Sequence, residues 1–235
     1  ESLVEAGGDR PLALLVLGSG PSGVEYAANA AALLRLRAPA AGWRLILLEE
    51  RERLLPGLPP GAAAGAEQAL RRAGVDVRCG VKVYHVQSGR VVLHRGEILD
   101  FDAAVLAFGG TVGDLFSASG LLTDADGALL VEPTLRVRDV PEIFAAGDCA
   151  RLWNRTLPRT GVFAVAQGRL LARNLLAALR NRPLRSFPRR RPPLRILSLG
   201  PREAVAVRGA CHHRAPCWRA VKHLLDRGFL LPFRG

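Results

Sequence analysis

Two groups of residues in this 235-residue chain have the types and spacing to bind a cofactor that carries phosphates and hydroxyls. The first is a G-x-G-x-x-G loop, which follows an apolar run at 12–17 and precedes an alanine-rich helical pattern, as the dinucleotide fingerprint requires. The tight turn, the approach of backbone to a pyrophosphate, and the close packing of helix on strand each need one glycine. Phosphate would lie at the N-terminus of the helix. The loop consists of Gly18, Ser19, Gly20, Pro21, Ser22 and Gly23.

Glu49 belongs to the same group, because it ends an expected strand at 43–48, 26 residues after Gly23 (23 + 26 = 49). A carboxylate near this offset accepts hydrogen bonds from the ribose hydroxyls and favours NAD over NADP. Arg51 and Arg53 are near enough in sequence to offset its repulsion of a 2′-phosphate. The alternative interpretation is that Glu49 lies in a solvated turn with these arginines.

The second group is Gly147 and Asp148, which end the apolar run 141–146. Open α/β sheets bind ligands at the carboxyl ends of their strands, so a buried strand at 141–146 would present Asp148 to ligand hydroxyls. Asp148 can also be explained as a turn residue or as the N-cap of a following helix.

The elements that position these residues follow from hydrophobic periodicity and turn residues. A strand, a helix at 22–36 and the strand at 43–48 form a β-α-β unit, and a helix at 61–73 with Gly74 as its C-cap leads to a strand at 75–78. Alternation between 81 and 94 predicts an antiparallel hairpin. Further elements are expected as a strand at 103–108, a helix at 161–180, strands at 195–199 and 204–207, and a helix at 216–229.

Together the two groups resemble the two-dinucleotide-binding flavoproteins, which include type II NADH dehydrogenases and pyridine nucleotide-disulfide oxidoreductases. In that family an FAD fingerprint comes first, an NAD(P) fingerprint second, and an A-x-G-D segment returns to the FAD. Residues 18–25 resemble the second fingerprint, and Ala146 to Asp148 resemble the return. The resemblance implies FAD and NAD as cofactors, and an oxidoreductase that passes hydride from NADH to flavin and then to an unidentified small-molecule acceptor.

The resemblance also implies roles for further residues. Gly109 stands where the family has A-T-G, a close approach of backbone to cofactor, although Phe108 replaces the threonine. Glu25 matches a glutamate near the contact of nicotinamide and flavin, which implies a catalytic role; stabilisation by the helix dipole explains it equally well. Gly161 and Val162 begin a helix whose free backbone N–H groups would donate to the flavin ring.

The electron acceptor and the subgroup are less well defined. Type II NADH dehydrogenases carry an A-Q pair where this chain has Gly161 and Val162, so quinone is a weaker expectation and only Gln167 remains as a nearby amide. Residues 160–168, 195–199 and 226–229 are most similar to oxidoreductase modules fused to selenophosphate synthetases.

The fold class is therefore expected to be α/β: a Rossmann-like NAD(P)-binding domain with an inserted antiparallel hairpin at 1–110, the returning segment of an FAD-binding domain at 111–180, and a small basic α+β region at 181–235. The first fingerprint is missing, the chain begins with Glu1, and it contains no Met. We therefore expect the C-terminal portion of a longer enzyme whose N-terminal FAD-binding half is a further partner. The alternative function is a non-catalytic, regulatory NAD-binding module.

Charge is distributed unevenly along the chain. Residues 1–150 hold 14 Lys or Arg against 19 Asp or Glu, and residues 151–235 hold 19 against 2, so −5 and +17 sum to the net +12. This asymmetry predicts an anionic partner such as a membrane surface, and the lack of interleaved aromatic residues disfavours nucleic acid as that partner. The bias of a GC-rich genome toward arginine is the alternative explanation.

No run of about 18 apolar residues and no signal-peptide pattern occurs, so we expect a cytoplasmic protein with peripheral membrane contact as the alternative. Cys211, His212, His213 and Cys217 match none of the common zinc-ligand spacings, and no metal site is expected. These cysteines include no C-x-x-C or C-x-x-x-x-C redox pair.

Overall fold

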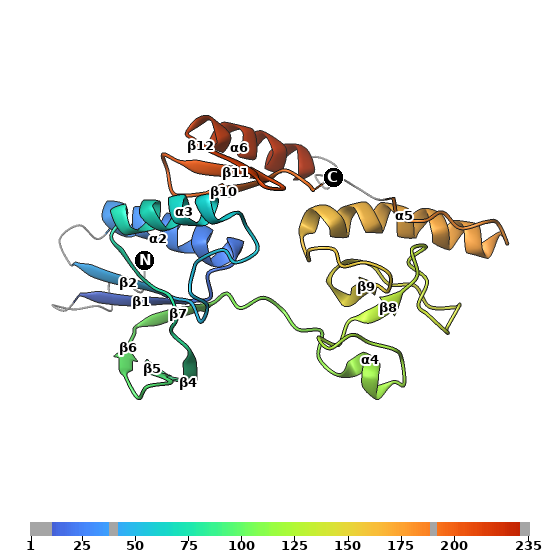
Figure 1. Ribbon diagram of the computed structural model, residues 1–235, viewed down its shortest axis with the longest axis horizontal. Helices are drawn as coiled ribbons and strands as arrows, with labels where there is room; N and C mark the ends of the chain where they lie inside the picture. Colours follow the sequence, from blue (N-terminus) through green and yellow to red (C-terminus); the bar gives the residue numbers. More distant parts are fainter. Residues whose placement is uncertain (1–10, 38–41, 189–191, 231–235) are drawn as a thin grey trace. The chain divides into compact units, whose positions relative to one another are not determined.

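The structure, a computed structural model, describes residues 11–37, 42–188 and 192–230 (Figure 1). It divides into two compact units, residues 1–109 with 194–235 and residues 110–193, which we call unit 1 and unit 2 and describe separately. Residues 189–191 and 231–235, part of the predicted basic region, lie outside the described residues.

Unit 1 is built on a parallel sheet of β1 (Leu12–Leu17), β2 (Trp43–Leu48), β3 (Val75–Arg78) and β7 (Ala103–Leu106). The strand order is β3-β2-β1-β7, with parallel pairing throughout. The chain therefore moves outward from β1 to β3 and returns to β7 on the other side of β1. The strand order reverses between β1 and β7, which is where open α/β sheets bind their ligands. The predicted Rossmann-like sheet is confirmed.

Helices α2 (Pro21–Arg37) and α3 (Pro60–Arg72) pack on one face of this sheet (Figure 1). Their buried positions are mostly alanine, which lets the helix backbones approach the strands closely. Gly74 follows α3 with φ +81° and donates its N–H to the carbonyl of Arg71, so the predicted glycine that ends this helix is confirmed.

The predicted hairpin is also confirmed and extends to a third strand. Strands β4 (Val83–Gln87), β5 (Arg90–Leu93) and β6 (Ile98–Asp100) form an antiparallel sheet, and Gly89 turns between the first two with φ +73°. Its buried residues Val91, Leu93 and Leu99 share a cluster with Leu15 and Leu17 of β1. The insertion is thereby fixed to the parallel sheet.

The C-terminal part of unit 1 consists of strands β10 (Arg195–Ser198), β11 (Ala204–Arg208) and β12 (Cys211–Ala215), followed by α6 (Cys217–Leu230). The sequence division had placed 181–235 in a region of its own. The structure instead groups residues from 194 onward with unit 1, because Leu197, Val205 and Val207 are buried in the same cluster as the alanines of α2 and α3.

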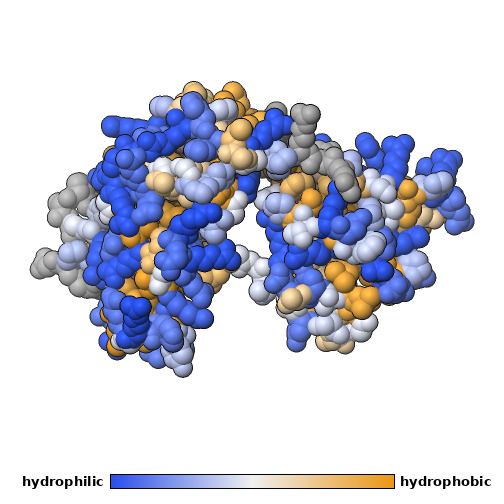
Figure 2. Space-filling model, viewed as in Figure 1, coloured by the Kyte–Doolittle hydropathy of each residue, from blue (hydrophilic) through white to orange (hydrophobic). Residues whose placement is uncertain are grey.

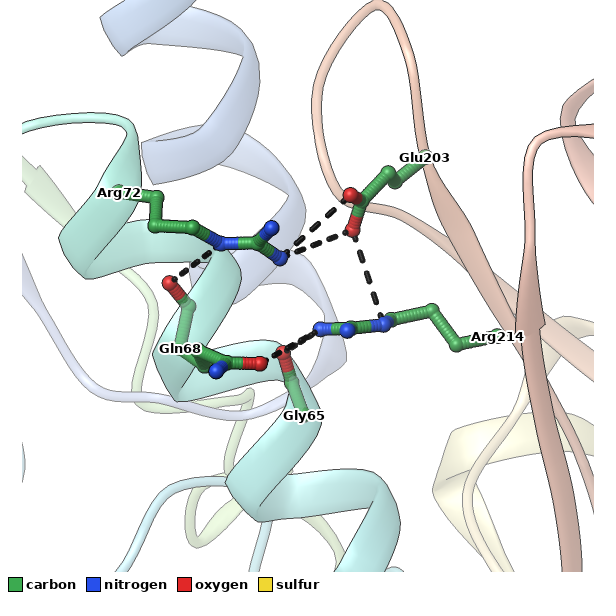
Figure 3. Close-up of polar contacts among 5 residues, drawn as sticks. All are labelled: Gly65, Gln68, Arg72, Glu203 and Arg214. Atoms are coloured by element: carbon green, nitrogen blue, oxygen red, sulfur yellow. Dashed lines mark hydrogen bonds and ion pairs between the residues drawn. The ribbon is translucent and has the colours of Figure 1, made fainter.

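Polar contacts between α3 and this sheet add to that packing (Figure 3). Arg214 donates to the carbonyl of Gly65 (3.0 Å) and to Oε1 of Gln68 (3.3 Å), and Glu203 accepts from Arg72 at 3.4 Å. The strand β12 also approaches the first turn of α3 closely: a Cβ on Gly61 would lie 2.6 Å from the His212 ring. Residues more than 130 positions apart in sequence thus hold the sheet on the helix.

Unit 2 contains α4 (Leu115–Ala118), the parallel pair β8 (Leu129–Val131) and β9 (Ala150–Leu152), the short 3₁₀ helix η1 (Gly147–Cys149) and α5 (Gly161–Leu179). Its core includes Val131, Leu135, Leu152, Phe163 and Phe187. The predicted helix at 161–180 is confirmed.

The predicted buried strand at 141–146 is wrong. The segment forms only an isolated bridge between Phe144 and Arg136. The neighbouring segment, to which it hydrogen-bonds, has positive φ at Leu135 (69°) and Asp139 (64°), so it is too bent to continue a regular ladder.

Candidate dinucleotide site

The 18–23 loop lies at the carboxyl end of β1, where the strand order reverses. Gly18 has φ +99°, and a Cβ there would lie 2.6 Å from the carbonyl oxygen of Ala107, just after β7. A Cβ on Gly23 would collide with the Gly18 carbonyl oxygen and lie 3.2 Å from Cβ of Ala107. The packing of α2 against β1 and the residue after β7 therefore requires both glycines.

Gly20 is different, because no described atom lies within 4 Å of the position its Cβ would take, and its φ is outside the left-handed region. The protein's own packing thus does not require glycine there. A bare backbone facing open space, next to the N-terminus of a 17-residue helix, fits the approach of a pyrophosphate. The open space at Gly20 beside the helix N-terminus therefore fits a dinucleotide-binding loop.

Glu49 is hydrogen-bonded to the same loop. Its Oε2 accepts hydrogen bonds from the backbone N (3.0 Å) and the hydroxyl of buried Ser19, and its Oε1 accepts from the backbone N of Arg51 at 2.9 Å. Burial is the largest influence and raises the pKa of Glu49, but the hydrogen bonds from Ser19 and Arg51 together outweigh it and lower the pKa. The carboxylate is held ionised beside the loop.

The arginines near Glu49 differ in their freedom to meet a phosphate. Arg53 donates to the carbonyls of Leu58 and Pro56, both at 3.1 Å, so its guanidinium is committed to its own segment. Arg51 contributes its backbone N–H to Glu49, and its charge also lowers the pKa of that carboxyl.

Gly109 follows β7 at the same edge of the sheet as the 18–23 loop. It has φ +87°, and no described atom lies within 4 Å of its Cβ position. The side chain of Phe108, which stands where the family has threonine, is 64% exposed. Both residues thus leave the carboxyl end of β7 open.

Glu25 is held by the C-terminal part of unit 1. Its Oε1 accepts from the backbone N of Ser198 at 2.7 Å and lies 3.6 Å from Nζ of Lys222. With Ser22 of the loop, these residues line a depression of about 690 Å³ between α2, β10 and α6. Sequence reasoning missed Ser198 and Lys222, and no local signal could have found them, since Ser198 is 173 residues from Glu25.

In unit 2 the structure brings together the other predicted residues. Gly147 has φ +76°, and its N–H donates to Oε1 of Gln167 at 2.6 Å, while a Cβ on Gly147 would lie 3.6 Å from Cβ of Ala164 on α5. Gly147 and exposed Asp148 therefore lie beside the first turns of α5, which begins at Gly161.

Two side chains of α5 near Gly147 differ in their exposure to solvent. Val162 is 55% exposed and Gln167 only 5% exposed. The sequence indicated Gln167 only as a nearby amide and did not predict that its Oε1 accepts the hydrogen bond from the Gly147 N–H. An exposed carboxylate beside an accessible helix N-terminus fits a ligand that has both hydroxyls and hydrogen-bond acceptors.

Comparison with known protein families identifies the family of the chain. A family model described as "Pyridine nucleotide-disulphide oxidoreductase" matches residues 5–168, which include every predicted site residue. The chain belongs to this family. The resemblance seen in the sequence is thereby confirmed, as is its α/β fold class.

Several curated proteins are similar in sequence to this chain. A probable NADH dehydrogenase of Dictyostelium discoideum is 27% identical over 76% of this chain and 42% of the relative. A type II NADH:quinone oxidoreductase of Haemophilus influenzae is 29% identical over 74% and 42%. An NADH dehydrogenase-like protein of Mycobacterium tuberculosis is 31% identical over 83% and 50%. The chain thus spans at most half the length of these curated relatives.

Two solved structures are similar in fold to this chain. NDH2 of Plasmodium falciparum, determined in complex with NADH, superposes with a TM-score of 0.75 at 15% identity, covering 94% of this chain and 63% of that one. An NAD-dependent persulfide reductase of A. fulgidus gives a TM-score of 0.67 at 24% identity, with 87% and 36% covered.

The cysteine and histidine residues near the C-terminus are part of strand β12 and the start of α6. Nδ1 of His213 accepts from Nε1 of Trp218 at 3.0 Å. Within the part of the chain that the structure describes, no group of three or more His, Cys, Asp or Glu side chains is arranged to hold a metal ion.

Proposed function

We propose that this chain is the NADH-binding part of a flavin-dependent oxidoreductase, whose FAD site it completes together with an N-terminal FAD-binding half. The observation that carries the proposal is the contrast within the fingerprint: Gly18 and Gly23 are required by packing, whereas Gly20 leaves space beside the helix N-terminus. In such an enzyme NADH supplies a hydride, FAD accepts it, and the protein contributes orientation and electrostatics.

The residues of unit 1 have distinct proposed roles. The backbone at Gly20 and Ser22 binds the pyrophosphate, and Gly109 allows the cofactor to approach the end of β7. Glu49 accepts from the ribose hydroxyls, since each carboxylate oxygen can accept more than one hydrogen bond. Because Arg53 is committed to Leu58 and Pro56 and the charge of Arg51 acts on Glu49 itself, Glu49 disfavours a 2′-phosphate, so NAD is the proposed nucleotide.

Glu25 is the proposed catalytic residue. Both of its contacts, from the Ser198 N–H and the Lys222 ammonium, are made to Oε1, and the carboxylate lines an open depression that begins at the loop. A carboxylate in this position can exchange a proton at Oε2 when the acceptor is reduced.

Asp148, Gly147, Gly161 and Val162 are the proposed flavin contacts of unit 2. Asp148 is exposed and accepts from ligand hydroxyls, while the N–H groups at the start of α5 donate to the ring. The acceptor is proposed to be a small molecule of the quinone class, because relatives are named NADH:quinone oxidoreductases. The proposed location is the cytoplasm.

Titration of the full 235-residue chain with NADH and with NADPH tests the proposal. We expect one NADH per chain, with NADPH bound at least about tenfold more weakly, since losing a hydrogen bond to a charged group costs about 1.5–3 kcal/mol. Glu49→Ala should reduce the preference for NADH. If neither nucleotide binds, the proposal is wrong.

A further inference from the structure

Asp124 lies in a turn of unit 2 and is nearly buried, with 11% of its side chain exposed. Its Oδ1 accepts hydrogen bonds from the backbone N–H groups of Asp126 (3.0 Å) and Ala128 (2.9 Å). Its Oδ2 accepts from Nε of Arg151 at 2.7 Å and lies 3.5 Å from Nη2 of Arg159. One carboxylate therefore holds its own turn through one oxygen and two arginines through the other.

The surroundings of Asp124 favour its ionised form. Burial is the largest influence on its pKa and raises it, but hydrogen bonds from the Ala128 N–H, the Arg151 guanidinium and the Asp126 N–H together outweigh burial and lower the pKa. Hydrophilic residues spread over the face of unit 2 seen in Figure 2, and ion pairs at such an exposed surface contribute little because water screens them. The ion pairs of Asp124 are screened less, because this carboxylate is nearly buried.

The two arginines that Asp124 holds lie next to the two segments for which flavin contacts are proposed. Arg151 lies in β9, just after η1, and η1 contains Asp148. Arg159 lies two residues before α5 begins at Gly161. Asp124 is 27 residues before Arg151 in the sequence and belongs to neither segment, yet it joins both.

The segment that leads into α5 has few other polar contacts. No backbone N–H of residues 156–160 donates a hydrogen bond to another described residue. Thr160, the N-cap of α5, makes no capping hydrogen bond with its side chain, and its hydroxyl has no partner among the described residues. Leu157 packs against the core of unit 2. Apart from this apolar contact, the ion pairs of Arg159 hold the chain just ahead of α5.

We propose that Asp124 is a positioning residue of the flavin site, which keeps η1 and the start of α5 at a fixed spacing so that both meet one flavin. The inference rests on the proposed function, in which Asp148 accepts from ligand hydroxyls and the N–H groups of α5 donate to the ring. Asp124 acts through Arg151 and Arg159 and does not itself touch the flavin. Groups that are held in place before binding give higher affinity than groups that the ligand must order.

Hydrogen exchange of the full 235-residue chain tests whether Asp124 joins the two segments. In Asp124→Asn the side-chain oxygen still accepts from the turn, but the charge that binds both arginines is lost. Exchange should therefore accelerate about tenfold both at 147–149 and at 163–165. Asp124→Glu keeps the charge and should restore part of the protection.

The matched control is Asp126→Asn on the same turn. Asp126 is 52% exposed and pairs only with Arg159, at 3.2 Å. Because exposed ion pairs contribute little, this variant should change exchange at both segments by less than about threefold.

Titration with FAD separates positioning from a purely structural role, with the chain expressed together with its N-terminal FAD-binding half. Asp124→Asn should weaken FAD binding about tenfold. Because Asp124 acts in part through Asp148, the same change should cost less than about threefold in an Asp148→Asn background. NADH affinity should not change, since Asp124 belongs to unit 2.

Three results would overturn the role of Asp124: faster exchange at only one of the two segments, an equal effect of Asp126→Asn, or an unchanged FAD affinity of Asp124→Asn. A purely structural role would give the same loss of FAD affinity with and without Asp148→Asn, and would also overturn it. If the parent protein itself binds no FAD, the proposed function is wrong, and the role of Asp124 at a flavin site is wrong with it.

Discussion

At the scale of single residues, the three glycines of the fingerprint are explained by different physical causes. Gly18 and Gly23 are glycines because backbone atoms occupy the space of a side chain. The space at Gly20 is empty, so packing does not account for its glycine, and we propose that a ligand approaches its backbone. The sequence pattern predicted a separate role for each glycine. The structure shows that the Ala107 carbonyl leaves no room for a side chain at Gly18, and that the Gly18 carbonyl leaves none at Gly23.

Gly23→Ala should destabilise unit 1. The new Cβ meets the Gly18 carbonyl, which cannot move without disturbing β1, and overpacking of this kind costs about 1–3 kcal/mol. The loss of unfolding free energy would be measured by urea unfolding, with hydrogen exchange in β1 as the probe. The matched control is Gly228→Ala, since Gly228 has no described atom near its Cβ position. Equal stability of the two variants would contradict the packing role of Gly23.

Glu49 should make the stability of unit 1 depend on pH. Its folded-state pKa is lowered from the ordinary value of 4.5, so it stabilises the fold above that value, and this stabilisation is lost as pH falls through the lowered pKa. Glu49→Gln removes the titrating group, and its urea midpoint should fall less steeply with acid than that of the parent. Parallel pH profiles would show that Ser19 and Arg51 do not favour the ionised form.

At the scale of elements, hydrophobic periodicity predicted the helices and strands of unit 1 well because each buries a regular apolar face. The run at 141–146 failed because its partner segment bends at Leu135 and Asp139, which residue types alone do not reveal. Strand β12 was missed because its exposed cysteine and histidines read as a ligand cluster instead of one face of a sheet.

Gln167 links α5 to the short helix η1, and its removal should make η1 more mobile. Gln167→Ala leaves the partly buried Gly147 N–H without its acceptor, at a cost of about 0.5–1.5 kcal/mol, and hydrogen exchange at 147–149 should accelerate. Asn174→Ala is the control on the same helix, because Asn174 bonds instead to Thr134 and Arg185. If both variants leave exchange at Gly147 unchanged, Gln167 does not position the A-x-G-D segment.

At the scale of the whole molecule, residues distant in sequence assemble unit 1. The C-terminal sheet packs on α2 and α3 and brings Ser198 and Lys222 to Glu25. Charge counting predicted an anionic partner for the basic region as a whole, but could not predict that residues from 194 onward join unit 1. Such an arrangement depends on tertiary packing, which no local pattern records.

NADH should stabilise the two units unequally. At a concentration of 100 Kd a ligand stabilises the form that binds it by about 2.7 kcal/mol. Hydrogen exchange in β1 and α2 should therefore slow when NADH is added, while exchange in α5 should not change. Equal protection of both units would contradict a nucleotide site confined to unit 1.

The central claim, that the 18–23 loop binds the pyrophosphate of NADH, is tested most directly by NADH titration of Gly20→Ala beside the parent chain and Gly228→Ala. The free chain has room for the new methyl group, so stability should be unchanged. The methyl group would occupy the proposed position of the pyrophosphate, and losing contacts to a charged group should weaken NADH binding by about tenfold or more. Unchanged NADH affinity in a stable Gly20→Ala chain would contradict the account.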